Sequence, residues 1–218
     1  MFEEVLHGGV ANAGAVVRSG RHVLRPSNPN SASIHRALRE LRATGYEGAS
    51  LPIRIDPDGR ERLEFMPGDV PLPPYPDWAQ TDDILVSTTE LIKGLHDASA
   101  VIDLGRDGWS GEMADPLGGP VLCHNDVCLE NVVFRNGSAI GLIDFDFAAP
   151  GRRVFDLAAF ARMCVPIDDE TNSTKLGWKP SDQPNRLRLV ADSYGLDAGD
   201  RRRRWWAEVS ARYAHAMS

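Results

Sequence analysis

Residues 121–146 hold the feature that most restricts the fold of this chain, a predicted β-hairpin with polar side chains at both of its feet. Two short apolar segments flank the pair Asn136-Gly137. Asn-Gly between two strand-like segments is the strongest short-range signal for a tight hairpin turn. Such a hairpin carries Asn131 at one foot and Asp144 at the other, so we expect these two side chains to converge.

The polar residues around the hairpin follow a fixed order: His124-x-Asp126, four residues, Asn131, the hairpin, and then D-F-D from Asp144 to Asp146. Mg²⁺ prefers oxygen ligands and keeps several waters, so one carboxylate, one amide oxygen and nucleotide phosphates make a natural site. An Asp that receives the substrate proton, followed by an Asn and an Asp for Mg²⁺, is the phosphoryl-transfer arrangement. The alternative is a β-hairpin with incidental polar ends, but the complete order favours phosphoryl transfer.

The segment Cys123–Asp146, followed by Phe155-Asp156-Leu157-Ala158, resembles the aminoglycoside phosphotransferase and choline kinase family. These proteins are relatives of the protein kinases that phosphorylate small molecules. Their signature is an HGD-type catalytic loop that ends in Asn, then an IDW-type metal motif, then D-L-A. Here Asn125 replaces the usual Gly and Phe145 replaces the usual Trp. The resemblance extends over nearly the whole chain.

The resemblance implies an α+β, protein-kinase-like two-lobe fold. Its N-lobe would be a small antiparallel β-sheet, and its C-lobe would be mainly helical and carry the catalytic β-hairpin. We expect the nucleotide-binding lobe at residues 1–68, and the catalytic loop and acceptor site in the lobe at residues 69–218. The Pro-rich segment 71–76 is the predicted connector. A length of 218 residues suits one domain or two small lobes that share a cleft.

Apolar periodicity and turn residues predict the remaining elements. Strands are expected at 2–6, 22–26, 49–55 and 60–66, and helices at 32–44, 81–98, from 155 onward, 186–194 and 201–217. Ser31 or Ser33 is expected to cap the first helix. Pro150-Gly151 is expected to break the chain after the D-F-D motif.

Two N-terminal segments are candidates for contacts with a nucleotide. Gly8, Gly9 and Asn12 lie between two predicted strands, where glycines let backbone N–H groups approach phosphate oxygens. The resemblance places the nucleotide-covering loop here, although an ordinary hairpin turn would have the same composition. Phe65 and Met66 match the hinge whose backbone reads the base in the family, and core packing is the alternative for both.

Arg25 ends the third predicted strand, where the kinase template has a Lys that holds the α and β phosphates. The lysines of this chain, Lys93, Lys175 and Lys179, all lie further along. Arg is always charged and can bind phosphate through two N–H groups, so the charge is kept while the geometry changes. Kinases pair this cation with a Glu of the next helix, but Glu40 lies late in that helix and is better interpreted as a surface residue. The partner of Arg25 is therefore left open.

The resulting hypothesis is transfer of the γ-phosphate of ATP or GTP to a hydroxyl of a small molecule such as an aminoglycoside, an amino alcohol or a sugar. Asp126 would orient and deprotonate that hydroxyl. Asn131 and Asp144 would hold Mg²⁺, and Arg25 would neutralise the other phosphates. Catalysis of this kind depends on positioning and on charge stabilisation.

Supporting roles are expected for three further residues. His124 would brace the catalytic loop, and the resemblance gives Asp156 the same task through backbone hydrogen bonds. Asp146 would either join the metal site or cap the following turn. The alternative function is a catalytically silent, kinase-like binding protein, which the missing Lys favours and the intact acids oppose. Protein phosphorylation is disfavoured because no long activation segment or A-P-E follows Asp146.

The amino-acid composition limits the kinds of partner and the cellular location that we expect for the chain. A net charge of −7 argues against a general nucleic-acid binder and is compatible with a cationic acceptor. The three cysteines have no paired metal spacing, which fits a reducing cytosol. No apolar segment is long enough to cross a membrane, and the N-terminus lacks a signal-like pattern, so we expect a cytoplasmic location. The acceptor and the oligomeric state are left open by the sequence.

Overall fold

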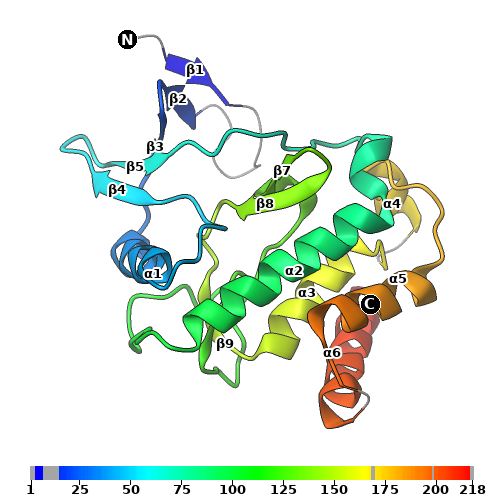
Figure 1. The fold of residues 1–218 in the computed structure, drawn as a ribbon. Helices are drawn as coiled ribbons and strands as arrows, with labels where there is room; N and C mark the ends of the chain where they lie inside the picture. The colour runs from blue at the N-terminus through cyan, green and yellow to red at the C-terminus, as the bar shows by residue number, and fades with distance from the viewer. Residues whose placement is uncertain (1–2, 7–14, 168–169, 198, 217–218) are drawn as a thin grey trace.

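The computed structural model describes residues 3–6, 15–167, 170–197 and 199–216. Its N-terminal part is a five-stranded antiparallel sheet, with one helix between its third and fourth strands (Figure 1). These elements are β1 (Glu3–Val5), β2 (Val17–Ser19), β3 (His22–Pro26), α1 (Ser31–Ala43), β4 (Pro52–Ile55) and β5 (Arg60–Glu64). The strand order is β1-β2-β3-β5-β4, so β3 and β5 are neighbours although α1 and β4 separate them in the sequence.

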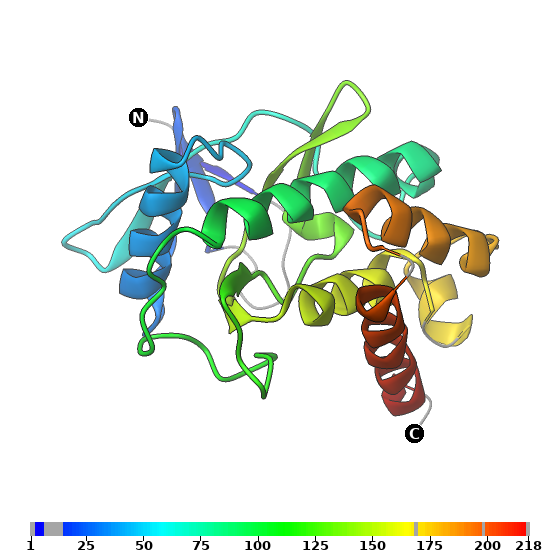
Figure 2. The ribbon, with the colours of Figure 1, turned by 60° about the horizontal axis from the view of Figure 1, so that its bottom comes forward.

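The C-terminal part is mainly helical and contains two small two-stranded sheets. Its helices are α2 (Asp82–Ser99), α3 (Arg153–Cys164), α4 (Glu170–Lys175), α5 (Gln183–Tyr194) and α6 (Asp200–Ala216). The small sheets pair β6 (Val121–Cys123) with β9 (Ala149–Gly151), and β7 (Val132–Arg135) with β8 (Ser138–Leu142). The β7–β8 hairpin lies between the large sheet and the helices, and α2 packs against β8 (Figures 1 and 2). This arrangement confirms the predicted α+β fold.

Helix α1 buries the face that its periodicity predicts. The buried apolar residues are Ile34, Ala37, Leu38 and Leu41. The predicted cap was wrong, because Asn30 is the N-cap residue and makes no side-chain cap hydrogen bond. The Ser31 hydroxyl instead accepts a hydrogen bond from the backbone N–H of Asn28 at 2.8 Å. The side chain of Ser31 therefore fixes the loop between β3 and α1.

The helical part has a continuous apolar core. Its fully buried members include Ile92 and Leu95 of α2, Leu157 and Phe160 of α3, and Trp205 of α6. Among the described residues, none of the helices combines the length and the apolar character that crossing a bilayer requires.

Two local predictions near the catalytic segment were wrong in their details. The sequence pattern predicts that the first hairpin strand begins at Asn131, but Asn131 ends a short 3₁₀ turn (Leu129–Asn131) and β7 begins after it. Pro150-Gly151, expected to break the chain, belongs to β9. Pro150 lies opposite Leu122 of β6, in a sheet of only two strands, where a residue without an N–H is tolerated.

The turn of the β7–β8 hairpin is built as the Asn-Gly pair predicts. Asn136 and Gly137 both have positive φ, 52° and 77°, which is the requirement of a type I′ turn. We expect Gly137→Ala to lower the free energy of unfolding by about 1 kcal/mol, because a Cβ in left-handed backbone is strained. Urea unfolding measures this, and Gly111→Ala is the matched control, since a Cβ there also meets open space but no positive φ is required. Equal stability of the two variants would contradict the backbone explanation.

Candidate active site

The catalytic loop runs from β6 to β7 and carries Asp126 close to Asn131. The side-chain amide of Asn131 donates to the backbone carbonyl of Asp126 at 2.9 Å and to its carboxylate Oδ2 at 3.0 Å. Burial raises the pKa of Asp126 above its ordinary value, and Asp144 adds to this increase, while His124 and Asn131 oppose it. The two predicted residues Asp126 and Asn131 therefore lie in contact.

The second foot of the hairpin returns to the first. The backbone N–H of Ile143 donates to the carbonyl of Asn131 at 2.9 Å, so Asp144 follows directly after the contact. Asp144 has a φ of +64°, a left-handed conformation that is costly for Asp. Conformations of this kind cluster at functional sites, where the surrounding structure enforces them. The two feet of the hairpin therefore lie side by side, and Asn131 and Asp144 both line the same cavity.

The backbone conformation at Asn125 explains why Asn can stand where the family signature has Gly. Its φ is +67°, so the position requires left-handed backbone, which Gly adopts freely and Asn tolerates better than most residues. Its side chain donates to the carbonyl of Phe147 at 2.8 Å. The loop conformation is thus compatible with Asn, and the side chain ties the catalytic loop to the residue after D-F-D.

Arg25 of β3 lies at the centre of a group of carboxylates. Its Nη1 donates to Asp144 Oδ1 at 2.8 Å and its Nη2 to Asp146 Oδ1 at 2.6 Å. Its Nε donates to Glu61 Oε2 at 2.5 Å. Asn28 of the loop after β3 also donates to Asp146 Oδ1, at 2.9 Å. The N-terminal sheet and the D-F-D motif are therefore joined through one guanidinium group.

The cluster of Arg25 with Glu61, Asp144 and Asp146 contains more negative than positive charge, and this excess affects the pKa values of Arg25 and Asp146. Burial disfavours the charged form of Arg25, but Asp146, Glu61 and Asp144 together raise its pKa above the ordinary value. Burial raises the pKa of Asp146, and repulsion from Asp144 adds to this increase, although Arg25 opposes it. Several carboxylates thus share one cation, which makes further positive charge favourable at this place.

The donor set suits Mg²⁺. Asn131 and Asp144 offer an amide and a carboxylate oxygen beside the same cavity, and Asp146 adds a second carboxylate close by. Hard oxygen donors of this kind, completed by water and phosphate, are what Mg²⁺ prefers. The chemistry of the residues therefore fits the ion that the phosphoryl-transfer pattern requires.

A buried carboxylate beneath the site braces the catalytic loop. Asp156 of α3 accepts hydrogen bonds from the backbone N–H groups of His124 at 3.0 Å and Asn125 at 2.7 Å, and it contacts His96 Nε2 at 3.0 Å. Burial alone would raise the pKa of Asp156, but the hydrogen bond and charge of His96 lower it below the ordinary value. The ring of His124 lies 2.9 Å, at Nε2, from the carbonyl of Ile143. The start of the loop that carries Asp126 is thus fixed through His124 and Asn125.

His96, Cys123 and Asp156 also place potential metal-ligand atoms within 4.8 Å of one another. Both ring nitrogens of His96 are already used, Nδ1 by the hydroxyl of Tyr194 at 2.7 Å and Nε2 by Asp156. Burial raises the pKa of the Cys123 thiol well above its ordinary value. This cluster is therefore a buried hydrogen-bond network that supports the loop.

The support from Asp156 gives a stability prediction. We expect Asp156→Asn to lower the free energy of unfolding by roughly 2 kcal/mol, because an amide cannot accept all of the bonds of the buried carboxylate. Thermal or urea unfolding measures the change. Asp97→Asn is the control, since Asp97 makes exposed ion pairs with Lys93 and Arg153 and should cost less than about 1 kcal/mol. Equal losses in both variants would argue against the bracing role.

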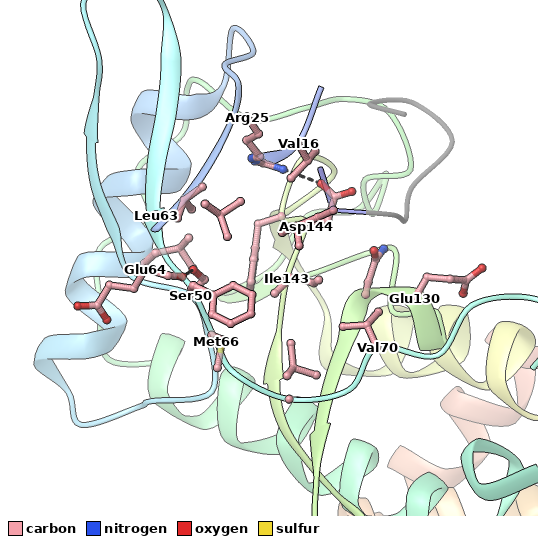
Figure 3. Close-up of a pocket in the computed structure, with 18 of the residues that line it drawn as sticks. Val16, Arg25, Ser50, Leu63, Glu64, Met66, Val70, Glu130, Ile143 and Asp144 are labelled. Carbon is pink, nitrogen blue, oxygen red and sulfur yellow. Dashed lines mark hydrogen bonds and ion pairs between the residues drawn. The ribbon is translucent and has the colours of Figure 1, made fainter. Parts of the chain in front are cut away.

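A cavity of about 290 Å³ opens between the sheet, α1 and the hairpin. Arg25 and Asp144 lie together at one end of this cavity, and Met66 lies at the other (Figure 3). Apolar residues also line this cavity, namely Val16, Val23, Leu38, Leu63, Val70, Val133 and Ile143. Phe65 and Met66 line it as well. The predicted loop residues Gly8, Gly9 and Asn12 lie outside the described residues.

Sequence reasoning missed Glu61 and Asn28. Glu61 is fully buried on β5, on the same side of the strand as Leu63. An acidic residue at an inward-facing position of a strand indicates a buried polar site, because a buried carboxylate requires a cation or hydrogen-bond donors. Asn28 gave no comparable signal, since loops between a strand and a helix often contain Asn.

Comparison with known proteins gives consistent matches. The family model of the phosphotransferase enzyme family matches residues 34–206. A trifolitoxin immunity protein of Rhizobium leguminosarum bv. trifolii is 29% identical over 194 residues, which are 85% of this chain and 72% of that protein. An ethanolamine kinase of Plasmodium vivax superposes with a TM-score of 0.61 at 15% identity, over 97% of this chain and 72% of that one. The structure of the streptomycin-ATP-APH(2")-IIa ternary complex superposes with a TM-score of 0.56 at 16% identity, over 99% of this chain and 88% of that one.

Proposed function

Because the chain belongs to the phosphotransferase enzyme family, we propose that it transfers the γ-phosphate of a nucleoside triphosphate to a hydroxyl group of a small molecule. The observation that carries the proposal is that the candidate phosphate-binding and metal-binding residues lie at one cavity, beside the candidate base. Arg25, Asp144 and Asn131 line this cavity, and Asp126 lies beside Asn131. In this proposal residues 1–68 form the nucleotide lobe, and residues 69–218 form the lobe that receives the acceptor.

Each residue has a task that follows from its chemistry. Asp126 accepts the proton of the acceptor hydroxyl as the oxygen attacks phosphorus, and the burial that raises its pKa makes it a better base. Arg25 neutralises the phosphates that are not transferred, since its two Nη groups form a fork that suits phosphate oxygens. Asp156 and His124 hold the loop that carries Asp126 in position. Phe65 and Met66 lie where the base of the nucleotide would be bound.

Asn131 and Asp144 would hold Mg²⁺, with Asp146 as the neighbouring acid. When bound, the ion supplies positive charge to the phosphate oxygens as the bond to the leaving group breaks. The chain itself contributes the fixed position of these ligands at the two feet of one hairpin. Asp146 is held in place by Arg25 and Asn28.

The relatives suggest which acceptors to test. They include an ethanolamine kinase, an aminoglycoside phosphotransferase whose complex contains streptomycin and ATP, and an immunity protein against a toxin. The acidic chain, with a net charge of −7, is compatible with a cationic acceptor. An amine-bearing alcohol or antibiotic with a free hydroxyl is therefore the acceptor class that we propose.

One observation favours a second candidate, a kinase-like binding protein that does not catalyse transfer. Arg25 replaces the usual Lys, and its guanidinium group is bonded to both acids of the D-F-D motif. If these bonds persisted with nucleotide present, Oδ1 of Asp144 would stay bound to Arg25 and would not be available to Mg²⁺. The complete set of Asp126, Asn131 and Asp144 opposes this candidate, because the fold alone does not require all three.

Turnover against an acceptor panel tests the proposal. Purified protein is incubated with ATP or GTP, with and without Mg²⁺, and with aminoglycosides, ethanolamine, choline, sugars and peptide antibiotics. We expect Mg²⁺-dependent formation of nucleoside diphosphate and of one phosphorylated acceptor, identified by mass spectrometry. Binding of a panel compound or of nucleotide without any phosphorylated product would favour the silent binding protein.

A further inference from the structure

Arg25 and Glu61 are cross-strand partners in the structure. They lie directly opposite each other where β3 pairs with β5, and Nε of Arg25 is 2.5 Å from Oε2 of Glu61. Glu61 is fully buried and Arg25 is 8% exposed. Charges are buried in this way only when they are paired and hydrogen-bonded, so each of the two residues depends on the other.

A histidine of α1 also contacts Glu61. Nε2 of His35, on α1, lies 3.3 Å from Oε1 of Glu61. Burial alone would raise the pKa of Glu61, but the contact with His35 and the charge of Arg25 lower it to about 2. The helix that supplies an acid in the kinase template therefore supplies an imidazole here, and the acid comes from the neighbouring strand.

We propose that Glu61 is the positioning residue that aims Arg25 at the phosphates of the nucleotide. The inference rests on the proposed function. Because Glu61 binds Nε, neither Nη group is used by Glu61, and Nη1 reaches Asp144, which lines the cavity. Those two groups exchange their present partners, Asp144 and Asp146, for phosphate oxygens, while the bond to Glu61 remains in place.

Glu61 acts through Arg25 and not on the nucleotide. Arg25 lines the cavity, whereas Glu61 has no exposed surface and is not among the lining residues. A long Arg side chain without its anchor would sample several rotamers and would also be drawn toward the carboxylates of the D-F-D motif. Loss of the Glu61 charge should therefore weaken nucleotide binding only when Arg25 is present.

The test measures the affinity of the full chain for ATP with Mg²⁺ by calorimetry. We expect Glu61→Gln to weaken binding about tenfold or more, since a charge-assisted hydrogen bond becomes a neutral one. Arg25→Gln should weaken it at least as much, and the double variant should be no weaker than Arg25→Gln alone. Glu40→Gln is the matched control, because Glu40 is the only acid of α1, and it should leave the affinity unchanged.

The outcomes separate this inference from the function it rests on. If the wild type binds ATP and Glu61→Gln binds it equally well, or if the effects of the two substitutions add, the positioning role is overturned and the proposed function stands. If the wild type binds neither ATP nor GTP, both are overturned. Should Glu61→Gln fail to fold in circular dichroism, Glu61→Asp keeps the buried charge but shortens the anchor, and weaker ATP binding by that variant is the supporting result.

Discussion

Asp126→Asn is expected to reduce the rate of phosphoryl transfer by about 10²–10⁴-fold, the usual contribution of a positioned general base. Asn has the size of Asp and can keep a hydrogen bond to Asn131, which now lies 3.0 Å from the carboxylate. It cannot accept the proton of the acceptor hydroxyl. Nucleotide affinity should not fall, because the substitution removes a carboxylate that repels Asp144. Steady-state kinetics with the acceptor found in the panel, together with calorimetry, measures both quantities.

Asp83→Asn is the control for that experiment. Asp83 is exposed in the first turn of α2, so its substitution removes the same charge and should leave kcat unchanged. A kcat for Asp126→Asn within a few-fold of the wild type would remove Asp126 from the reaction. A parallel loss of nucleotide affinity would instead indicate a damaged loop.

Asp144→Asn is expected to reduce transfer by about 10³-fold, near the upper limit for loss of one electrostatic contact in a transition state. Unlike Asp126→Asn, it should also weaken metal binding, because Asn is a poorer ligand for a hard cation than a carboxylate. The variant additionally removes one of the partners of Arg25. Binding of Mn²⁺ in the presence of a non-hydrolysable nucleotide, followed by electron paramagnetic resonance, measures the metal affinity apart from turnover.

The two substitutions thus have different signatures, which is what assigns the roles. Asp126→Asn should lower kcat with Mn²⁺ binding intact, and Asp144→Asn should lower both. Asp83→Asn again provides the control with the same change of charge. Unchanged Mn²⁺ binding by Asp144→Asn would exclude Asp144 as a ligand.

The catalytic hairpin could be predicted because its determinants are local. The turn, both strands and the residues at their feet lie between residues 121 and 146, and the Asn-Gly pair aligns the strand ends next to the turn, where Arg135 lies opposite Ser138 and Phe134 opposite Ala139. A β-bulge between Val133 and Phe134 then shifts the register toward the feet, which the Asn-Gly pair does not predict. The exact start of β7, one residue after Asn131, likewise depends on the short 3₁₀ turn that precedes it.

The partner of Arg25 could not be predicted because it depends on a pairing between distant strands. Glu61 lies 36 residues from Arg25 in the sequence, and α1 and β4 intervene. The alternation of β5 shows that Glu61 faces inward, but only the sheet order shows that it faces Arg25. Similarly, Pro150 joins β9 because β6 lies beside it, so tertiary structure overrides the local preference of Pro-Gly to end an element.

The most direct test of the central claim is the affinity of the wild-type protein for ATP and GTP, measured by calorimetry with Mg²⁺ and again with EDTA. This measurement does not require the acceptor to be known. The arrangement of Arg25, Asn131 and Asp144 predicts that at least one nucleotide binds and that its affinity falls strongly when Mg²⁺ is removed. Binding that is equally tight with and without Mg²⁺, or no binding of either nucleotide, would contradict a phosphotransferase site in this cavity.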